Sequence, residues 1–205
     1  MRAACVLALV TTLVPAGAPT PPEARAPARY TVRLDTSRGD IVIAVERQWA
    51  PRGADRFHEL VRDGFYDEAR FFRVVADRWA QFGIHRDSKV SQAWRTRTFP
   101  DDPRTQSNVR GTVVFAWAVP NGRTTQVFIN LGDNSAALDP QGFAPFGRVV
   151  GGMEVADTLY SGYGEESGGG IRAGHQDLLF ELGNAYLLER YPRLDYIRRA
   201  IIEEP

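Results

Sequence analysis

The chain has 205 residues, 43% of them hydrophobic, which is long enough for one domain with a buried core and a terminal extension. Its 25 basic and 25 acidic residues give a formal net charge of zero and are well mixed along the chain. A nucleic-acid-binding protein usually concentrates its basic residues in a patch or stripe. No such cluster is visible, so nucleic acid is excluded as an expected partner.

The N-terminal residues differ in composition from the rest. Arg2 is followed by a mainly apolar run over 3–14 and by the small residues of Pro15-Ala-Gly-Ala18, the pattern of a secretory signal peptide. We therefore expect a signal peptide over 1–18 and a chain that is exported, either periplasmic or secreted. The single basic residue leaves an uncleaved membrane anchor as the alternative. The Pro- and Ala-rich residues 19–29 predict a disordered linker.

The first folded segment is expected to be a β-hairpin. Two alternating runs of β-forming residues, 30–36 and 40–46, flank the turn Ser37-Arg-Gly39. Apolar residues at helical spacing then predict an amphipathic helix over 56–62, which Gly64 ends.

Two further short strands are expected at 70–75 and 79–83. Alternation places Phe71 and Arg73 on one face of the first strand, and Trp79 and Gln81 together on one face of the second. An arginine between aromatic residues in a strand is commonly a surface residue whose stem packs on its neighbours. Arg73 taken alone therefore indicates no particular chemistry.

The stretch 111–131 contains two β-rich runs joined by the turn-rich Val119-Pro-Asn-Gly-Arg123. In the second run Gln126 and Phe128 share one face, opposite an apolar face. An amide beside an exposed aromatic ring suggests a binding surface, although this stretch taken alone favours a half-exposed strand with one stray phenylalanine. The preceding polar residues 85–110 are predicted to form a loop.

The last third of the chain mixes helix and loop signals. Residues 153–160 have helical spacing, and 161–174 are Gly-rich without the signature of a phosphate loop, so we expect a flexible loop there. Helix formers fill 177–190, interrupted by Gly183. The segment 196–203 fits either a final strand or a helix.

Counting these elements gives seven or eight short, mostly hairpin-linked strands and two or three helices, which predicts an antiparallel barrel with helices over its ends. The motifs of serine hydrolases, zinc proteases, phosphate loops and dinucleotide-binding folds are absent from the sequence. Its three His are far apart, and its only Cys, Cys5, lies in the expected signal peptide. We therefore expect neither a metal nor a cofactor.

Between residues 30 and 160, and again at the last strand, the chain resembles the cyclophilin-type peptidyl-prolyl cis-trans isomerases. The motifs that carry the resemblance are Phe71-Phe-Arg-Val-Val75 with Gln81, Phe115-Ala116 with Thr125-Gln-Val-Phe-Ile-Asn130, and Leu138 with Phe146-Gly-Arg-Val-Val-Gly-Gly-Met153. The resemblance implies a mainly β fold over 30–205: an eight-stranded antiparallel closed β-barrel capped by two α-helices, with the active site on its outer surface. The tail is similar to that of exported bacterial members, which implies an extra C-terminal helix near 176–190 and a strand near 196–203.

The resemblance also implies an activity, the isomerisation of X-Pro bonds in exported polypeptides to assist their folding. It assigns catalysis to Arg73, as hydrogen-bond donor to the prolyl nitrogen of the twisted amide. Proline-containing polypeptides are the implied partners, with a cyclosporin-type ligand as a further one, and the chain is expected to be a monomer. The implied substrate-binding residues are Gln81, Trp79, Ala116, Trp117, Ala118, Gln126, Phe128, Leu138 and Phe143.

The sequence departs from the family pattern around the expected proline pocket. Arg78 stands where the family has a phenylalanine wall, Trp79 replaces a smaller residue, and Trp117 replaces Asn or Met. A narrower, more cationic pocket keeps an alternative open, a cyclophilin-like module that binds proline-containing peptides but isomerises them weakly or not at all.

Overall fold

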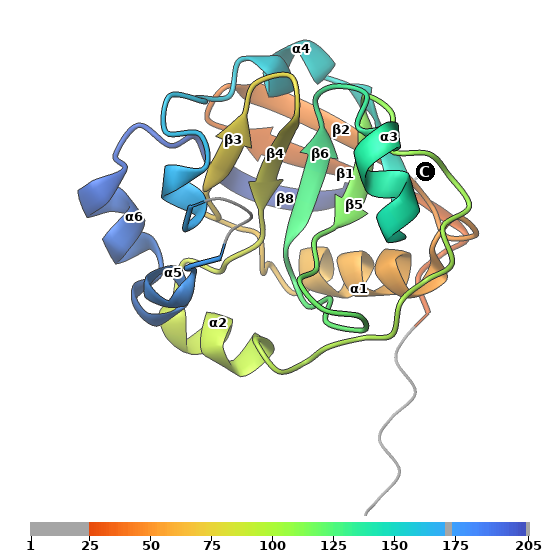
Figure 1. The fold of residues 1–205 in the computed structure, drawn as a ribbon, viewed down its shortest axis with the longest axis horizontal. Helices are drawn as coiled ribbons and strands as arrows, with labels where there is room; N and C mark the ends of the chain where they lie inside the picture. Colours follow the sequence, from red (N-terminus) through yellow and green to blue (C-terminus); the bar gives the residue numbers. More distant parts are fainter. Residues whose placement is uncertain (1–24, 171–173, 204–205) are drawn as a thin grey trace, which may run out of the picture.

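The computed structural model describes residues 25–170 and 174–203, which form one domain built on a single eight-stranded sheet (Figure 1). Every strand pair is antiparallel, in the order β3-β4-β6-β5-β7-β2-β1-β8. The predicted mainly β fold is confirmed. The strands are β1 (Arg29–Thr36), β2 (Gly39–Glu46), β3 (Arg73–Val75), β4 (Trp79–Phe82), β5 (Thr112–Phe115), β6 (Val127–Asn130), β7 (Pro145–Gly151) and β8 (Ile197–Glu203).

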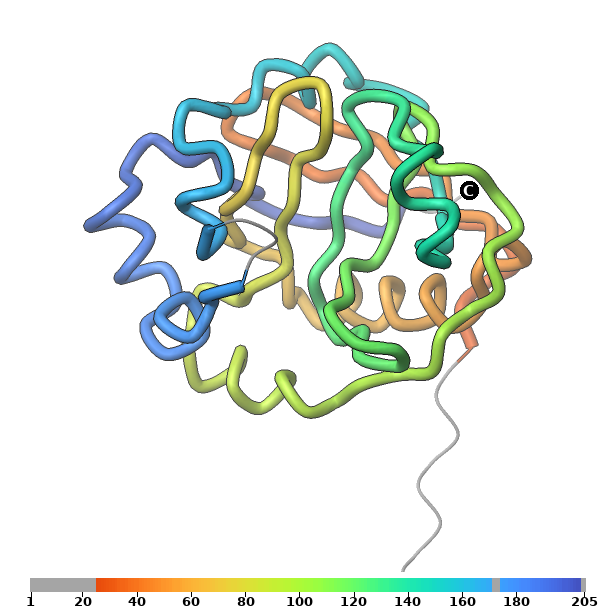
Figure 2. Tube along the Cα trace, viewed as in Figure 1, coloured from red at the N-terminus to blue at the C-terminus, as the bar shows by residue number. Residues whose placement is uncertain are grey.

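The sheet curls so that its edge strands, β3 and β8, approach each other (Figure 2). They do not form a ladder of their own. Instead the chain segments just before them meet, with an isolated bridge between Arg70 and Tyr196. The backbone N–H of Phe71 donates to the carbonyl of Asp195 at 2.9 Å, and that of Ile197 donates to Ala69 at 2.9 Å. The predicted closed barrel is thus completed by a short seam rather than by paired edge strands.

Helices cover the barrel at its two ends (Figure 1). The first, α1, begins at Pro51, whose missing N–H is tolerated in a first helical turn, and it buries Phe57, Leu60 and Val61. The opposite end is covered by α4, which buries Ala156. The helices are α1 (Pro51–Arg62), α2 (Ser88–Trp94), α3 (Ser135–Leu138), α4 (Met153–Asp157), α5 (Asp177–Leu182) and α6 (Asn184–Arg190), with 3₁₀ turns η1 (Asp139–Gln141) and η2 (Glu166–Gly168).

Large side chains fill the interior of the barrel. Phe57 from α1 packs on Phe146 of β7 with ring centroids 4.9 Å apart, and Phe146 packs on Phe115 of β5 at 5.3 Å. Along β1, Val32 and Leu34 point inward and are fully buried. Such close packing gives stability and fills the interior with side chains, so we expect the binding site on the outer face.

The structure differs from the sequence-based expectations in three local features. The polar segment 85–110 contains α2, capped by the Asp87 carboxylate, which accepts from the backbone N–H of Lys89 at 2.8 Å. The expected tail helix is two helices, α5 and α6, because the backbone turns at Gly183 with φ of 58°. The strand expected at 70–75 begins only at Arg73, and Phe71 joins the buried core instead of sharing the face of Arg73.

The predicted linker also needs a correction where the structure describes it. Ala26 is buried, and its backbone N–H donates to the Asp55 carboxylate at 2.9 Å. Residues 25–29 therefore belong to the domain. The predicted signal peptide, 1–18, lies outside the described residues. Among those that are described, no helix is long and apolar enough to cross a membrane.

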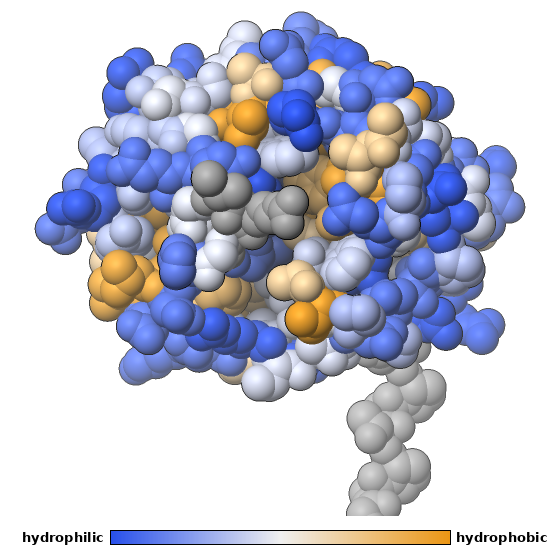
Figure 3. Space-filling model, viewed as in Figure 1, coloured by the Kyte–Doolittle hydropathy of each residue, from blue (hydrophilic) through white to orange (hydrophobic). Residues whose placement is uncertain are grey.

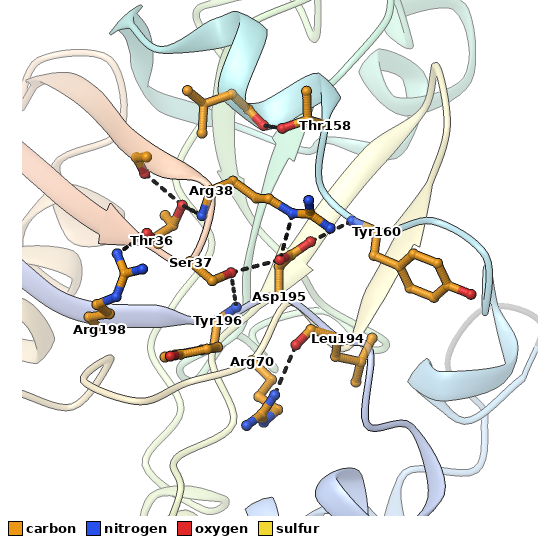
Figure 4. A network of polar contacts seen from close by, with 12 residues as sticks. Thr36, Ser37, Arg38, Arg70, Thr158, Tyr160, Leu194, Asp195, Tyr196 and Arg198 are labelled. Carbon is orange, nitrogen blue, oxygen red and sulfur yellow. Dashed lines mark hydrogen bonds and ion pairs between the residues drawn. The ribbon is translucent and has the colours of Figure 1, made fainter.

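A polar network around Asp195 fixes the entry into β8 (Figure 4). This carboxylate is 7% exposed and accepts from the Ser37 hydroxyl at 2.7 Å, the Arg38 Nε at 2.9 Å and the backbone N–H of Tyr160 at 2.7 Å. The network joins the β1–β2 turn, the segment after α4 and the seam of the barrel. Its loss should therefore loosen the closure.

Replacing Asp195 by asparagine is expected to destabilise the fold by about 2–3 kcal/mol, because the amide of a largely buried asparagine cannot accept all three bonds and leaves at least one partly buried donor without its acceptor. For a domain of this size that lowers Tm by about 5–10 °C in thermal unfolding followed by circular dichroism. Asp157→Asn is the matched control, since Asp157 forms an exposed ion pair with Arg110 and should change stability by less than about 1 kcal/mol. Equal shifts for the two variants would contradict the role given to Asp195.

Candidate active site

A cavity of about 530 Å³ lies on the outer face of the barrel, over β4, β5 and β6. Figure 3, drawn from the same side as Figure 1, shows apolar surface near the middle of this face, surrounded by hydrophilic residues. All ten residues predicted for the site line this cavity. The lining residues are Arg73, Arg78, Trp79, Gln81, Ala116, Trp117, Ala118, Gly122, Thr124, Gln126, Phe128, Ala137, Leu138, Gln141 and Phe143.

Strand register brings the central residues into one row. Arg73 of β3 lies opposite Gln81 of β4, and Gln81 lies opposite Phe128 of β6. Directly opposed residues point to the same face of an antiparallel sheet, so the guanidinium, the amide and the ring stand side by side. The register thus places a cationic donor group next to an aromatic surface.

Hydrogen bonds fix the polar side chains of this row. Arg73 donates from Nη1 to the Gln81 Oε1 at 2.8 Å, and Gln81 donates from Nε2 to the Gln126 Oε1 at 2.7 Å. Gln81 is 2% exposed, so its amide serves mainly to hold its neighbours. Its two bonds connect Arg73 to Gln126 on the far side of the cavity.

The apolar part of the cavity is a small cluster separate from the main core. Phe128 is 5% exposed and packs with Val114 and Leu138. The Trp79 and Phe143 rings stand edge-on to Phe128, with centroids 6.4 and 5.8 Å away. These side chains form a shallow apolar floor with aromatic sides, suited to a small aliphatic ring.

The walls of the cavity are unusually cationic and aromatic. The Arg73 and Arg78 guanidinium groups both lie over the Trp79 ring, at 4.6 and 4.9 Å from its centroid. Trp117 packs on Phe143 at 5.2 Å and lies under Arg123. Burial lowers the pKa of Arg123 to about 10, which leaves it charged at neutral pH.

Sequence reasoning missed a carboxylate at the site. Glu165, 92 residues away in sequence, accepts from Arg73 Nε at 2.6 Å and from Arg73 Nη2 at 2.9 Å. It comes from the Gly-rich stretch expected to be a flexible loop, and its neighbour turn η2 packs against β3. No local pattern of the loop indicated this contact, because two adjacent glutamates in a Gly-rich stretch form no periodic pattern.

A glutamine from the same region also reaches the site. Gln126 donates from Nε2 to the Gln176 Oε1 at 2.8 Å, and Gln176 donates from Nε2 to the carbonyl of Gly168 at 3.2 Å. The amide row that begins at Arg73 therefore ends on the segment that carries Glu165.

The lining residues define the chemistry available. They include no cysteine, serine or histidine that could act as a nucleophile or its base. They provide a positively charged hydrogen-bond donor, Arg73, near the apolar slot over Phe128. The segment 116–118 also lines the cavity. These described residues could therefore bind a peptide and polarise it by hydrogen bonding.

Comparison with known proteins identifies the class. The family model for cyclophilin type peptidyl-prolyl cis-trans isomerases matches residues 31–171. The chain belongs to this family, and its activity is peptidyl-prolyl cis-trans isomerisation, as predicted.

Named relatives and a solved structure agree with this placement. The chain is 34% identical over 158 residues to peptidyl-prolyl cis-trans isomerase A of Dickeya dadantii, covering 75% of this chain and 83% of the relative. It is 31% identical over 135 residues to peptidyl-prolyl cis-trans isomerase B of Escherichia coli, covering 62% and 82%. A cyclophilin type isomerase from Cryptosporidium parvum, solved in the presence of the dipeptide Ala-Pro, shares the fold with a TM-score of 0.60 at 19% identity, covering 85% of this chain and 99% of that one.

Proposed function

We propose that the cavity over β4, β5 and β6 is the isomerase centre, with Arg73 as its catalytic residue. The observation that carries this proposal is the strand register, which sets the Arg73 guanidinium and the Phe128 floor in one row within one cavity, with Gln81 between them. A prolyl ring on that floor would bring its own amide nitrogen next to the guanidinium. Donor and slot are therefore arranged for one particular kind of peptide bond.

The chemistry follows from amide resonance. Rotation about an X-Pro bond must overcome a barrier of about 18–20 kcal/mol because the C–N bond has partial double-bond character. In the twisted amide that resonance is lost, and the prolyl nitrogen becomes pyramidal and gains a lone pair. An N–H of Arg73 donates to this lone pair, which exists only near the transition state. The bond therefore lowers the barrier instead of merely tightening ground-state binding.

Gln81 holds Arg73, and the other predicted residues hold the substrate. Phe128 floors the prolyl slot, with Trp79 and Leu138 as its walls and Phe143 at its rim. The N–H of Ala116 already donates to the carbonyl of Gln126 at 2.9 Å. Backbone groups of Trp117 and Ala118, next along the chain, are then the ones that pair with the substrate backbone, beside the Gln126 side chain.

The substrates are proposed to be exported polypeptides. Support comes from the signal-peptide pattern of residues 1–18, with Ala18 as the last residue removed. The chain then acts as a monomer in a periplasm or outside the cell. Its substrates are folding intermediates whose folding is limited by prolyl isomerisation, and a cyclosporin-type compound would compete with them for the site. N-terminal sequencing of the exported protein tests this proposal. A mature chain that starts near residue 19 supports it, and an intact Met1 supports a membrane anchor instead.

A second function has one observation in its favour. Arg78 lines the cavity and stacks on Trp79, where the family usually has the phenylalanine wall of the proline pocket. A charged wall can hold a proline-containing segment while disfavouring the desolvated, twisted amide. Under this alternative the chain grips such segments as a chaperone and isomerises them weakly. Binding without turnover on an Ala-Pro-Phe peptide would favour it.

Replacing Arg78 by phenylalanine is expected to raise kcat/KM about threefold to tenfold, because a prolyl ring would then enter a pocket without a charge that must lose water. The rate is measured in a protease-coupled assay on an Ala-Pro-Phe peptide. Arg97→Phe is the matched control, since Arg97 also stacks on a tryptophan, Trp94, away from the cavity. No change in Arg78→Phe would mean that Trp79 already supplies the wall.

A further inference from the structure

The Gly-rich segment that ends the family match makes a close contact with the proposed catalytic side chain. We infer that Glu165 is a positioning residue, whose carboxylate fixes the guanidinium of Arg73 in the orientation needed for X-Pro isomerisation. This inference rests on the role proposed for Arg73. Arg73 itself touches the substrate, and Glu165 acts only through it.

The geometry of the pair is that of an orienting contact. Glu165 binds the side edge of the guanidinium through two bonds, at 2.6 Å to Nε and 2.9 Å to Nη2. Two parallel bonds define the plane of the guanidinium as well as its position. Gln81 takes a third N–H, on Nη1. Because each terminal nitrogen carries two hydrogens, one on Nη1 and one on Nη2 stay available beyond these bonds to described residues.

The aliphatic stem of Arg73 is held by the same segment. A Cβ placed on Gly168 would lie 2.7 Å from the Arg73 Cβ and 2.8 Å from its Cγ and Cδ. The absence of a side chain at Gly168 is therefore what lets η2 pack directly on the stem. With Trp79 at 4.6 Å from the guanidinium carbon, Arg73 is enclosed along its length and its side chain is only 12% exposed.

The segment is itself anchored to the site by a second route. Gln176 accepts from Gln126 and donates to the carbonyl of Gly168. A continuous set of contacts thus runs from Glu165 through Arg73, Gln81, Gln126 and Gln176 back to Gly168, three residues after Glu165. If the loop moved away from the barrel, both the Glu165–Arg73 and the Gln176–Gly168 hydrogen bonds would break. The loop and the arginine are therefore held together.

Two effects of the carboxylate oppose each other. The negative charge of Glu165 makes the guanidinium of Arg73 a weaker hydrogen-bond donor. Its two hydrogen bonds also hold Arg73 in one rotamer, so that substrate binding does not have to order this side chain. Arg has one of the most flexible side chains, and a preorganised donor needs no rearrangement as the amide twists. The prolyl nitrogen meets the guanidinium at N–H groups that do not point at the carboxylate, so we expect the orienting effect to dominate.

The test separates orientation from general stability. Glu165→Gln keeps the size of the side chain but loses the charge and one acceptor, and it should lower kcat about tenfold. KM should change less than about twofold, because the prolyl floor is untouched. Gly168→Ala should lower kcat by a similar factor through displacement of the Arg73 stem, although Glu165 is still present. Rates are measured by two-dimensional NMR exchange on an Ala-Pro-Phe peptide at high enzyme concentration.

Glu166→Gln is the matched control, because Glu166 is the next residue, has the same charge and is exposed; its activity should equal that of the wild type. In an Arg73→Lys background, which cannot form the forked pair, Glu165→Gln should cause no further loss. An equal loss in both backgrounds would overturn the inference, as would unchanged or raised kcat in Glu165→Gln alone. Arg73→Ala separates the two claims: if it loses most of its activity while Glu165→Gln is fully active, the role of Arg73 stands and the positioning role is rejected.

Discussion

Arg73→Ala is expected to lower kcat/KM for X-Pro isomerisation by about 10- to 100-fold in a protease-coupled assay. A hydrogen bond from a charged donor contributes about 1.5–3 kcal/mol, and each 1.36 kcal/mol of barrier corresponds to about a tenfold change in rate. The loss should fall on kcat, since the guanidinium is proposed to bind the nitrogen only when the amide is twisted. Residual activity would come from the desolvated slot, which still favours a partly rotated amide.

Two variants control this prediction. Arg73→Lys keeps the charge but loses the planar fork that Gln81 and Glu165 hold, so its activity should lie between the wild type and Arg73→Ala. Arg97→Ala removes a tryptophan-stacked arginine remote from the cavity and should leave the rate unchanged. If Arg73→Ala were as active as the wild type, catalysis would have to be assigned to another group.

Phe128→Ala is expected to raise KM about 10- to 100-fold, since burying one apolar side chain is worth about 1.5–3 kcal/mol and the prolyl ring would lose its floor. The value of kcat should change much less, because the row from Arg73 to Gln81 is retained. Peptide affinity is measured by titration calorimetry beside the kinetics.

Stability must be measured together with this affinity. Phe128 is packed by Val114, Leu138 and two aromatic rings, and truncating a buried phenylalanine costs about 3–5 kcal/mol of folding free energy. Phe128→Leu keeps most of the packing and should give a smaller rise in KM with a folded chain. Unchanged KM in a folded Phe128→Ala variant would place the prolyl ring somewhere other than over β6.

The predictable parts of the site are those with local signals. Period-two alternation assigns Phe128 and Gln126 to the outer face of a strand. The motif Phe71-Phe-Arg-Val-Val75, followed by Gln81, identifies Arg73 and Gln81 as further members of the site. Strand register then brings these side chains together, because Arg73, Gln81 and Phe128 lie opposite one another in one row across β3, β4 and β6. The barrel and its end helices follow from the same patterns.

The unpredicted parts depend on contacts between distant segments. Glu165 and Gln176 reach the site from a loop and a helix end whose sequence has no periodicity, and their partners lie 92 and 50 residues away. The sequence shows a glycine at position 183 but does not predict that one helix ends there and a second one begins. A Cβ at that position would lie 2.6 Å from the carbonyl of Arg86, so the constraint comes from tertiary packing.

The central claim is that the cavity catalyses X-Pro rotation through Arg73, and NMR exchange spectroscopy on a bound proline peptide tests it most directly. At saturating peptide, wild-type protein should give strong exchange cross-peaks between the cis and trans prolyl resonances. Arg73→Ala should still shift the peptide resonances on binding but should lose most of that exchange. Equally fast cis–trans exchange in both proteins, at equal peptide saturation, would contradict the account.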